Sequence, residues 1–335
     1  MAKRALVLGS GGPIGIAWQA GLLAGLAEAG VELADADFIL GTSAGSLVGA
    51  QIAMGKEPGA LAESIVNVAL PISGMSLEPD FTTFIDKMAE AVSGKRRARD
   101  VRVEIGQWAL ESQTISEEIF VAVIGQLFHE LADDAWPGRN YACTAVDALS
   151  GEFVVWNKEA GAGIKRAVAS SCSVPGIFPP ISINGRRYMD GGTRSATNAD
   201  LAKGYDAAVV VAVSGAAGDP KMAEQFRRQL DKELAALPES GTKVELIVPN
   251  AASIEAFGLN LMDPGRSAGA AQAGLAQGMA QAAALRAVWL GARSRSATAR
   301  SSRTSPRTGI RNGYSSGTVL RAEQIRERAS RASDR

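Results

Sequence analysis

Two short apolar runs near the start of the chain each end in a glycine turn that leads into a helical pattern. RALVLG (residues 4–9) and DFILG (37–41) are typical of buried strands. Apolar residues then recur at helical spacing from Gly15 to Ala29 and look helical again from Ala44 to Ala53. Gly30 suits the position just after a helix. Strand, glycine turn and helix, repeated twice, indicate an α/β protein with a parallel sheet.

The same pattern continues later in the chain. Further strands are expected in five runs: 141–146, 152–156, 186–192, 205–214 and 242–249. The first two of these are spaced to form a hairpin. Further helices are expected in 163–172, in 221–237 and in the Ala-rich 268–285, the last as a buried, closely packed helix. Residues 1–291 are therefore expected to form one α/β domain.

Residues 71–138 differ from this pattern and are predicted to be a mostly helical insertion beside the sheet. FTTFIDKMAEAV and residues 116–131 look helical, and a charged loop, GKRRARD, lies between them. Thr114 and Glu117 have the spacing of a helix capping box. The mixture of large apolar residues and loops suits a cap over a substrate site, and it suits plain packing equally well.

Charge separates the end of the chain from the rest. Residues 292–335 contain eleven arginines, no lysine and three acidic residues, a net charge of +8, which leaves −8 on residues 1–291. This Ser-, Thr- and Arg-rich segment has almost no large apolar residues and is expected to be disordered. A solvated tail is favoured over an arm for a membrane surface. No specific nucleic-acid binding is expected.

Cysteine content and hydropathy bear on the compartment. With only Cys143 and Cys172 the chain has no disulfide scaffold, so a reducing cytoplasm is expected. The N-terminal residues resemble a signal peptide, with two cations before an apolar run, but we favour a buried first strand because GSGGP interrupts the run. No stretch is apolar enough for a membrane span. Association with a membrane is therefore considered as surface contact.

The loop LGSGGPIG (residues 8–15) joins the first predicted strand to the first predicted helix. Backbone N–H groups at such a turn attract negative charge, either a pyrophosphate or a reaction oxyanion. The dinucleotide fingerprint G-x-G-x-x-G fits at Gly9 and Gly11 but meets Ile14 at the third position. Glu28 and Glu32 fall at the end of the helix rather than after a second strand. A nicotinamide-dependent enzyme is therefore the least favoured interpretation.

GTSAG (residues 41–45) places Ser43 between a predicted strand and a predicted helix. In a nucleophile elbow, a serine occupies this sharp turn with its hydroxyl exposed. Gly41 and Gly45 would let the turn close without Cβ clashes. The alternative is a small-residue turn with no catalytic role, and the five residues alone do not distinguish the two.

A serine nucleophile needs a base. The chain has one histidine, His129, in the amphipathic helix of the insertion, and no histidine follows Asp190. A Ser–His–Asp triad is therefore disfavoured, and His129 is interpreted as a helix residue near the water boundary. Asp190 in YMDGG ends a predicted strand, where it is either a turn residue or the base. As a base it needs burial to raise its pKa from ~3.9.

Considered together, these motifs resemble those of the patatin-like phospholipases. That family combines a glycine-rich oxyanion loop, a G-x-S-x-G elbow and an aspartate in D-G-G or D-G-A, and the chain has SGGPIG (10–15), GTSAG (41–45) and DGG (190–192) in this order. SSCSVPGIFPPISINGRRYMDGG (170–192) is also similar to the family's approach to the aspartate. The resemblance covers roughly residues 4–290.

The resemblance implies a three-layer α/β/α fold with a central, mostly parallel sheet. It implies a Ser–Asp dyad, with Ser43 as nucleophile and Asp190 as general base. The N–H groups of Gly11 and Gly12 would line the oxyanion hole, and that of Ala44, directly after the nucleophile, would assist by the general geometry of an elbow. A lipid or acyl ester is the expected partner, and no metal or cofactor is needed.

Two residues depart from the family's G-G-G-x-R/K-G loop. Ser10 replaces the first glycine, and Ile14 stands where the family has a basic residue. The loss of that cation favours a less charged ester or a neutral lipid. The expected activity is hydrolysis of lipid esters. The alternatives are a lipid-binding or regulatory module with weak turnover, and an acyltransferase that uses the same pair.

Overall fold

The computed structural model describes residues 3–67, 96–132, 135–215 and 220–289, with isolated positions between 83 and 90. The predicted tail 292–335 and most of FTTFIDKMAEAV lie outside the described residues. Within them, no helix has the length and apolar character needed to cross a membrane.

The described strands form one eight-stranded sheet with the hydrogen-bonded path β5-β6-β3-β2-β1-β7-β8 and with β4 paired to β3. Strands β1, β2, β3, β7 and β8 are parallel, and β4, β5 and β6 are antiparallel to their neighbours. The strands are β1 (Arg4–Leu8), β2 (Phe38–Gly41), β3 (Tyr141–Asp147), β4 (Phe153–Trp156), β5 (Ile181–Ile183), β6 (Arg186–Asp190), β7 (Ala207–Val211) and β8 (Lys243–Ile247).

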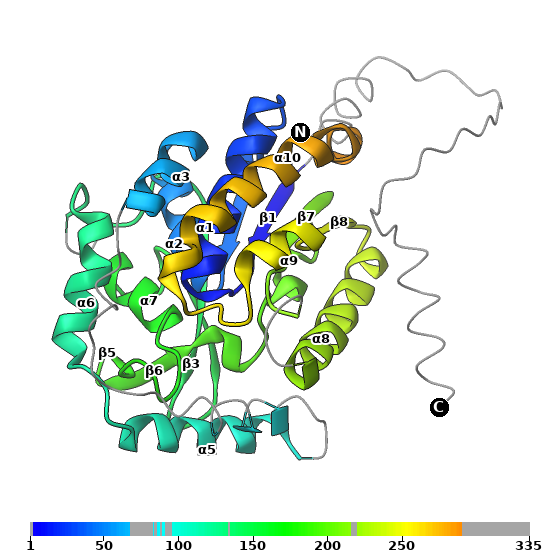
Figure 1. The fold of residues 1–335 in the computed structure, drawn as a ribbon. Helices are drawn as coiled ribbons and strands as arrows, with labels where there is room; N and C mark the ends of the chain where they lie inside the picture. The colour runs from blue at the N-terminus through cyan, green and yellow to red at the C-terminus, as the bar shows by residue number, and fades with distance from the viewer. Residues whose placement is uncertain are drawn as a thin grey trace.

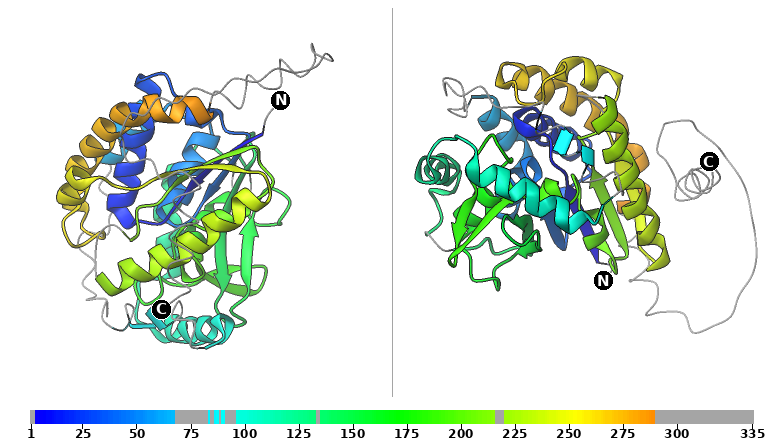
Figure 2. Two further views of the ribbon diagram at one scale, coloured as in Figure 1. Left: turned by 90° about the vertical axis from the view of Figure 1, so that its right-hand side faces the viewer. Right: turned by 90° about the horizontal axis from the view of Figure 1, so that it is seen from below.

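Helices flank this sheet (Figure 1). They are α1 (Gly12–Glu28), α2 (Ala44–Ala53), α3 (Pro58–Asn67), α5 (Ala98–Glu111), α6 (Glu117–Gly125), α7 (Ile164–Ser171), α8 (Pro220–Glu239), α9 (Ala251–Phe257) and α10 (Ser267–Trp289). In the left view of Figure 2, α5 lies at the opposite end of the molecule from α1 and α10.

The central strands bury both faces, which creates three layers. Along β1, Leu6 and Leu8 belong to the main core with residues of α1, α2 and α10. Ala5 and Val7 point the other way, into a second core that includes Leu234 of α8. Apolar residues that alternate between two cores along one strand are expected for a parallel sheet covered on both sides, and Arg4 at the start of β1 is the strand's one charged residue. The predicted α/β/α sandwich with a mostly parallel sheet is confirmed.

Strands β2 and β6 follow one another along the same edge of β3. Cys143 of β3 pairs with Gly41 on one side and with β4 on the other. Two residues further on, Ala145 pairs with Asp190 and again with β4. Because β4 occupies one edge throughout, β2 and β6 share the opposite edge. The C-terminal ends of these two strands therefore meet, although they are far apart in the sequence.

Helices α1 and α10 pack with their backbones in contact (Figures 1 and 2). A Cβ added to Gly21 or Gly25 of α1 would overlap carbonyl oxygens of α10, and one added to Gly274 or Gly278 would overlap carbonyl oxygens of α1. The prediction of a buried, closely packed Ala-rich helix therefore holds for one face of α10. The other face is exposed, for example at Met279.

The structure corrects four details of the predicted insertion and of the first helix. Helix α1 begins at Gly12, inside the predicted glycine loop. Helix α5 begins at Ala98, within the stretch predicted to be a charged loop. The capping box of Thr114 and Glu117 is wrong, because Ser116 caps α6 through the N–H of Ile119 at 3.3 Å. The helix predicted over 116–131 is α helical only over Glu117–Gly125.

Candidate active site

Ser43 lies at a sharp turn between β2 and α2. Its backbone has φ 52° and ψ −118°, a conformation that costs energy in a non-glycine residue and is found at strained functional turns. A Cβ on Gly41 would overlap the backbone of Gly45, and a Cβ on Gly45 would overlap the carbonyl of Leu8. Only glycine fits at either position. GTSAG therefore has the backbone of a nucleophile elbow.

Side chains from α7 and α2 hold this turn in place. The Oγ of Ser171 accepts a hydrogen bond from the Ser43 N–H at 3.0 Å. The carbonyl of Ser43 accepts hydrogen bonds from Ser46 Oγ at 2.6 Å and from Cys172 Sγ at 3.3 Å. Sequence reasoning missed these residues, since no spacing rule links SSC to GTSAG. Because the N–H of Ser43 is bound, donors for an oxyanion must come from neighbouring residues.

Asp190 ends β6 beside the turn that carries Ser43. Its Oδ1 accepts a hydrogen bond from the N–H of Gly192 at 2.6 Å. Its Oδ2 is buried and has no hydrogen-bond partner among the described residues. Burial raises the pKa of Asp190 to about 7, and the Ser43 hydroxyl and the Gly192 amide offset only part of that rise. The carboxyl group thus has one free oxygen and a pKa suited to proton transfer near neutrality.

The Ser43 hydroxyl is close enough to Asp190 to lower its pKa, yet it does not satisfy Oδ2 with a hydrogen bond of ordinary geometry. Catalytic hydrogen bonds are often long in unliganded sites and shorten when substrate binds. The structure therefore brings together the two residues that the sequence singled out, in an arrangement that allows proton transfer.

The first residues of α1 and α2 lie at the same cavity. Gly12 opens α1 with φ 60°, and Ala44 opens α2 directly after Ser43. Both line the cavity beside Ser43, whereas Gly11 is buried and is not among the lining residues. First-turn N–H groups have no intrahelical partner. The N–H groups of Gly11, Gly12 and Ala44 accordingly have no partner in the described structure.

The two residues that depart from the family loop have structural roles. Ser10 Oγ lies 3.0 Å from Ser214 Oγ, which fixes the loop to the turn that follows β7. Ile14 is fully buried in the main core and does not line the cavity. Its N–H donates to the carbonyl of Leu261 at 3.3 Å. The position of the usual basic residue is here part of the hydrophobic packing of α1.

A cavity of about 300 Å³ opens beside Ser43. None of its described lining residues is charged. Phe120 of α6 and Phe178 stack in its wall with ring centroids 4.4 Å apart. Its apolar side chains are Pro13, Ile16, Leu47, Ile115, Ile119, Phe120, Val123, Ile124, Val174, Phe178 and Met262. Such a lining suits a hydrocarbon chain.

The remaining candidate residues lie apart from this chemistry. His129 is exposed, its side chain retaining 70% of its accessible surface, and its ring contacts the carbonyl of Gln126. The prediction that His129 lies near the water boundary holds, but its placement in a helix is wrong, because the residue lies in a turn after the short 3-10 segment Gln126–Phe128. Burial raises the pKa of both cysteine thiols, that of Cys143 to about 12. The thiol of Cys172 is therefore protonated at neutral pH and supports the elbow as a hydrogen-bond donor.

A family model for patatin-like phospholipase matches residues 6–203. Among solved structures, the chain is similar to VipD from Legionella pneumophila at 12% identity and a TM-score of 0.43, covering 84% of this chain and 67% of VipD. It is also similar to the type III effector protein ExoU at 19% identity and a TM-score of 0.37, covering 84% of this chain and 53% of ExoU. The chain thus spans about half the length of ExoU. The matched range of the family model contains the glycine loop, the elbow and the DGG turn, and by this match the chain belongs to the patatin-like phospholipase family.

Proposed function

We propose that the protein is a serine acyl-hydrolase that cleaves lipid esters, with Ser43 as nucleophile and Asp190 as general base. The observation that carries this proposal is the buried, unpartnered Oδ2 of Asp190 beside Ser43 at the edge of an apolar cavity. An unsatisfied buried carboxylate oxygen is costly, and such groups are concentrated at functional sites. The family supplies the reaction class.

In this proposal, Asp190 Oδ2 takes the proton of the Ser43 hydroxyl as Oγ attacks the acyl carbonyl carbon. The resulting tetrahedral intermediate collapses to an acyl-serine and releases the alcohol, which leaves with that proton. Water then attacks the acyl-serine while Asp190 accepts its proton. The fatty acid leaves, and the proton returns to Ser43. A pKa of about 7 makes Asp190 a competent proton carrier near neutral pH.

The negative oxygen of each tetrahedral intermediate needs preorganised donors. The N–H groups of Gly12 and Ala44, with Gly11 behind them, are the donors that this proposal assigns. The helix N-termini add a favourable dipole for a developing anion. Loss of one oxyanion donor typically costs ~3–4 kcal/mol of transition-state stabilisation.

The cavity favours an acyl chain as the group bound there. A volume of about 300 Å³ is small for a complete two-chain lipid and lies at the lower limit of ligand pockets. One chain would enter, and the rest of the lipid would stay outside. Ile119 and Phe120 in the wall belong to α6, within the predicted insertion 71–138. This placement favours the interpretation of the insertion as a cap within an acyl-hydrolase domain spanning residues 1–291.

We extend the proposal to contact with a membrane surface at the cavity mouth. Ile119 lines the cavity while 55% of its surface is exposed. Leu259 is 89% exposed and lies three residues before Met262, another lining residue. Ile119→Glu should weaken co-flotation with phosphatidylcholine vesicles. Leu149→Glu is the matched control and should leave flotation unchanged. Leu149 is 61% exposed and lies in the turn between β3 and β4.

The test of hydrolysis is fatty-acid release from short-chain nitrophenyl esters and from a panel of phospholipids and neutral glycerides. Ser43→Ala and Asp190→Asn should abolish release, whereas Ser64→Ala, an exposed serine on α3, should not. Equal turnover by wild type and Ser43→Ala would remove the assignment. Failure of a fluorophosphonate to label Ser43 would support the binding-module alternative, whereas labelling would argue against it. Ester products formed with an added alcohol would indicate acyl transfer. The cytoplasmic location stays a prediction.

A further inference from the structure

Asn198 lies six residues after the DGG turn in an unusual position for a polar side chain. It is fully buried and has φ 52°, in the left-handed region. Its Nδ2 donates to Thr42 Oγ1 at 3.0 Å and to the Ser195 carbonyl at 2.8 Å. Its Oδ1 accepts from Arg194 Nη1 at 2.7 Å. The amide thus uses both of its N–H donors and an acceptor inside the protein.

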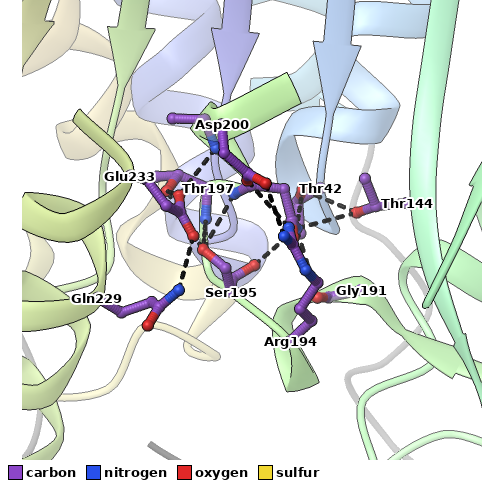
Figure 3. A network of polar contacts seen from close by, with 11 residues as sticks. Thr42, Thr144, Gly191, Arg194, Ser195, Thr197, Asp200, Gln229 and Glu233 are labelled. Carbon is purple, nitrogen blue, oxygen red and sulfur yellow. Dashed lines mark hydrogen bonds and ion pairs between the residues drawn. The ribbon is translucent and has the colours of Figure 1, made fainter. Parts of the chain in front are cut away.

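The partner on the nucleophile side is the residue that precedes Ser43. Thr42 Oγ1 lies 2.8 Å from Thr144 Oγ1 of β3 (Figure 3). The same Thr144 hydroxyl packs against Gly191, directly after Asp190, so closely that a Cβ on Gly191 would overlap it. The Asn198 amide also lies 3.4 Å from the Gly191 carbonyl. The elbow, β3 and the turn after Asp190 therefore meet at one side chain.

A buried carboxylate holds the segment on both sides of Asn198. Glu233 of α8 is 4% exposed. Its Oε2 accepts from Thr197 Oγ1 and from the Ala199 N–H, both at 2.8 Å. Its Oε1 accepts from Gln229 Nε2 at 3.0 Å. Because both neighbours of Asn198 are tied to one carboxylate, the left-handed backbone between them is fixed by its surroundings.

We propose that Asn198 is a positioning residue that sets the Ser43 hydroxyl against the Asp190 carboxylate, and that Glu233 fixes the loop that carries it. This inference rests on the proposed hydrolytic function. Neither Asn198 nor Glu233 lines the cavity, so neither is expected to touch the acyl chain. The amide instead joins the segment before Ser43 to the segment after Asp190. A displacement of ~1 Å in such a pair lowers turnover by about 100-fold.

The test substitutes Asn198→Gly, which removes the amide without imposing strain at positive φ. The matched control is Asn184→Gly, because Asn184 has φ 50° in the exposed turn between β5 and β6. With a nitrophenyl ester, Asn198→Gly should lower kcat about 10- to 100-fold with KM within about twofold of wild type. Asn184→Gly should change neither value by more than about twofold. Circular dichroism at the assay temperature checks that both variants are folded.

Thr42→Val provides a second, nearly isosteric removal of the same link from the nucleophile side. It should also lower kcat at constant KM, and Thr42→Val combined with Asn198→Gly should lose little more than either change alone. Multiplicative losses in the double variant would overturn the proposal, as would wild-type kcat in a folded single variant. If Asn198→Gly does not fold, kcat of Thr42→Val decides alone.

The same kinetic measurements distinguish a failure of the hydrolase assignment from a failure of the positioning role. Turnover that is independent of Ser43 overturns both the hydrolase and the positioning role. Turnover that is lost in Ser43→Ala but retained in Asn198→Gly overturns the positioning role only. Loss of kcat with unchanged KM in Asn198→Gly, set against an unaffected Asn184→Gly, supports both.

Discussion

Asp190→Asn should stabilise the protein at alkaline pH and much less at acidic pH. The folded state raises the pKa of Asp190 to about 7, whereas an unfolded chain gives Asp a pKa of ~3.9. Because its pKa is higher in the folded state, the Asp190 carboxyl contributes to the free energy of unfolding, and this contribution is fully present below the unfolded-state pKa. That stability is lost as the pH rises through the folded value, so the window runs from about pH 4 to pH 7. Asparagine has no such titration.

The size of the effect follows from these two pKa values. At pH 8, keeping the Asp190 carboxylate buried costs about 4 kcal/mol of unfolding free energy relative to its protonated form. At pH 5 the corresponding cost is about 1.5 kcal/mol, because Asp190 is protonated in the folded protein while the unfolded chain is still mostly ionised. The stability gained by Asp190→Asn should therefore grow by about 2.5 kcal/mol between pH 5 and pH 8. Packing differences between the two side chains cancel in this comparison.

Urea unfolding of the full chain at pH 5 and pH 8 measures the difference. Asp147→Asn is the control, because Asp147 is also buried but has its pKa lowered. Its burial opposes that shift, and hydrogen bonds from Arg186 and from Ser150 outweigh the burial. The stability that Asp147 contributes is lost only below about pH 4, so its variant should show no change between pH 5 and pH 8. A pH-independent difference for Asp190→Asn would refute the raised pKa.

Three further outcomes are expected. Ester hydrolysis should rise about tenfold per pH unit up to an apparent pKa near that of Asp190, about 7, and then level off, as a pH–rate profile would show. Gly45→Ala should yield little folded protein on expression, because its methyl group would overlap the carbonyl of Leu8 in β1. Gly59→Ala should express normally, because its methyl group would have no neighbouring atom. Gly21→Ala should lower the midpoint of urea unfolding, because the added methyl group disrupts the contact with α10. The added methyl group of Gly269→Ala meets no neighbouring atom, so this variant should raise stability by about 0.5–1 kcal/mol. Equal midpoints for the last two variants would contradict the backbone contact.

The sheet and its adjoining helices could be predicted because their signals are local. An apolar run that ends at a glycine identifies β1 and β2 without any knowledge of their partners. Helix α5 gave no such signal. Its buried side chains are few, Val101, Ile105 and Ala109, and the helix begins in an arginine-rich stretch. Strand β5 has three residues, too few for a periodic pattern.

The motif residues of the site could be predicted from the sequence, but the residues that support them could not. Ser43 and Asp190 stand in glycine-flanked motifs that local sequence reveals. Their supporting residues act across long sequence separations, as Ser171 does on the elbow and Glu233 on the loop after Asp190. No spacing connects these partners. The Glu117 carboxylate is a similar case, because it accepts hydrogen bonds from Ser182 rather than capping its own helix.

The meeting of β2 and β6 on one edge of β3 has a consequence for the dynamics of the site. Gly41 and Asp190 pair with β3 residues only two positions apart. Bending or twisting of the sheet therefore displaces both segments together and leaves their relative position almost unchanged. The separation of Gly41 and Asp190 can change only when pairing along this edge of β3 opens. Hydrogen exchange at Thr144 and Val146 would report that opening, because N–H direction alternates along a strand and the next N–H of the same set, that of Ala148, donates to the carbonyl of Arg187. The geometry between the side chains of Ser43 and Asp190 should consequently persist while the sheet bends or twists slowly.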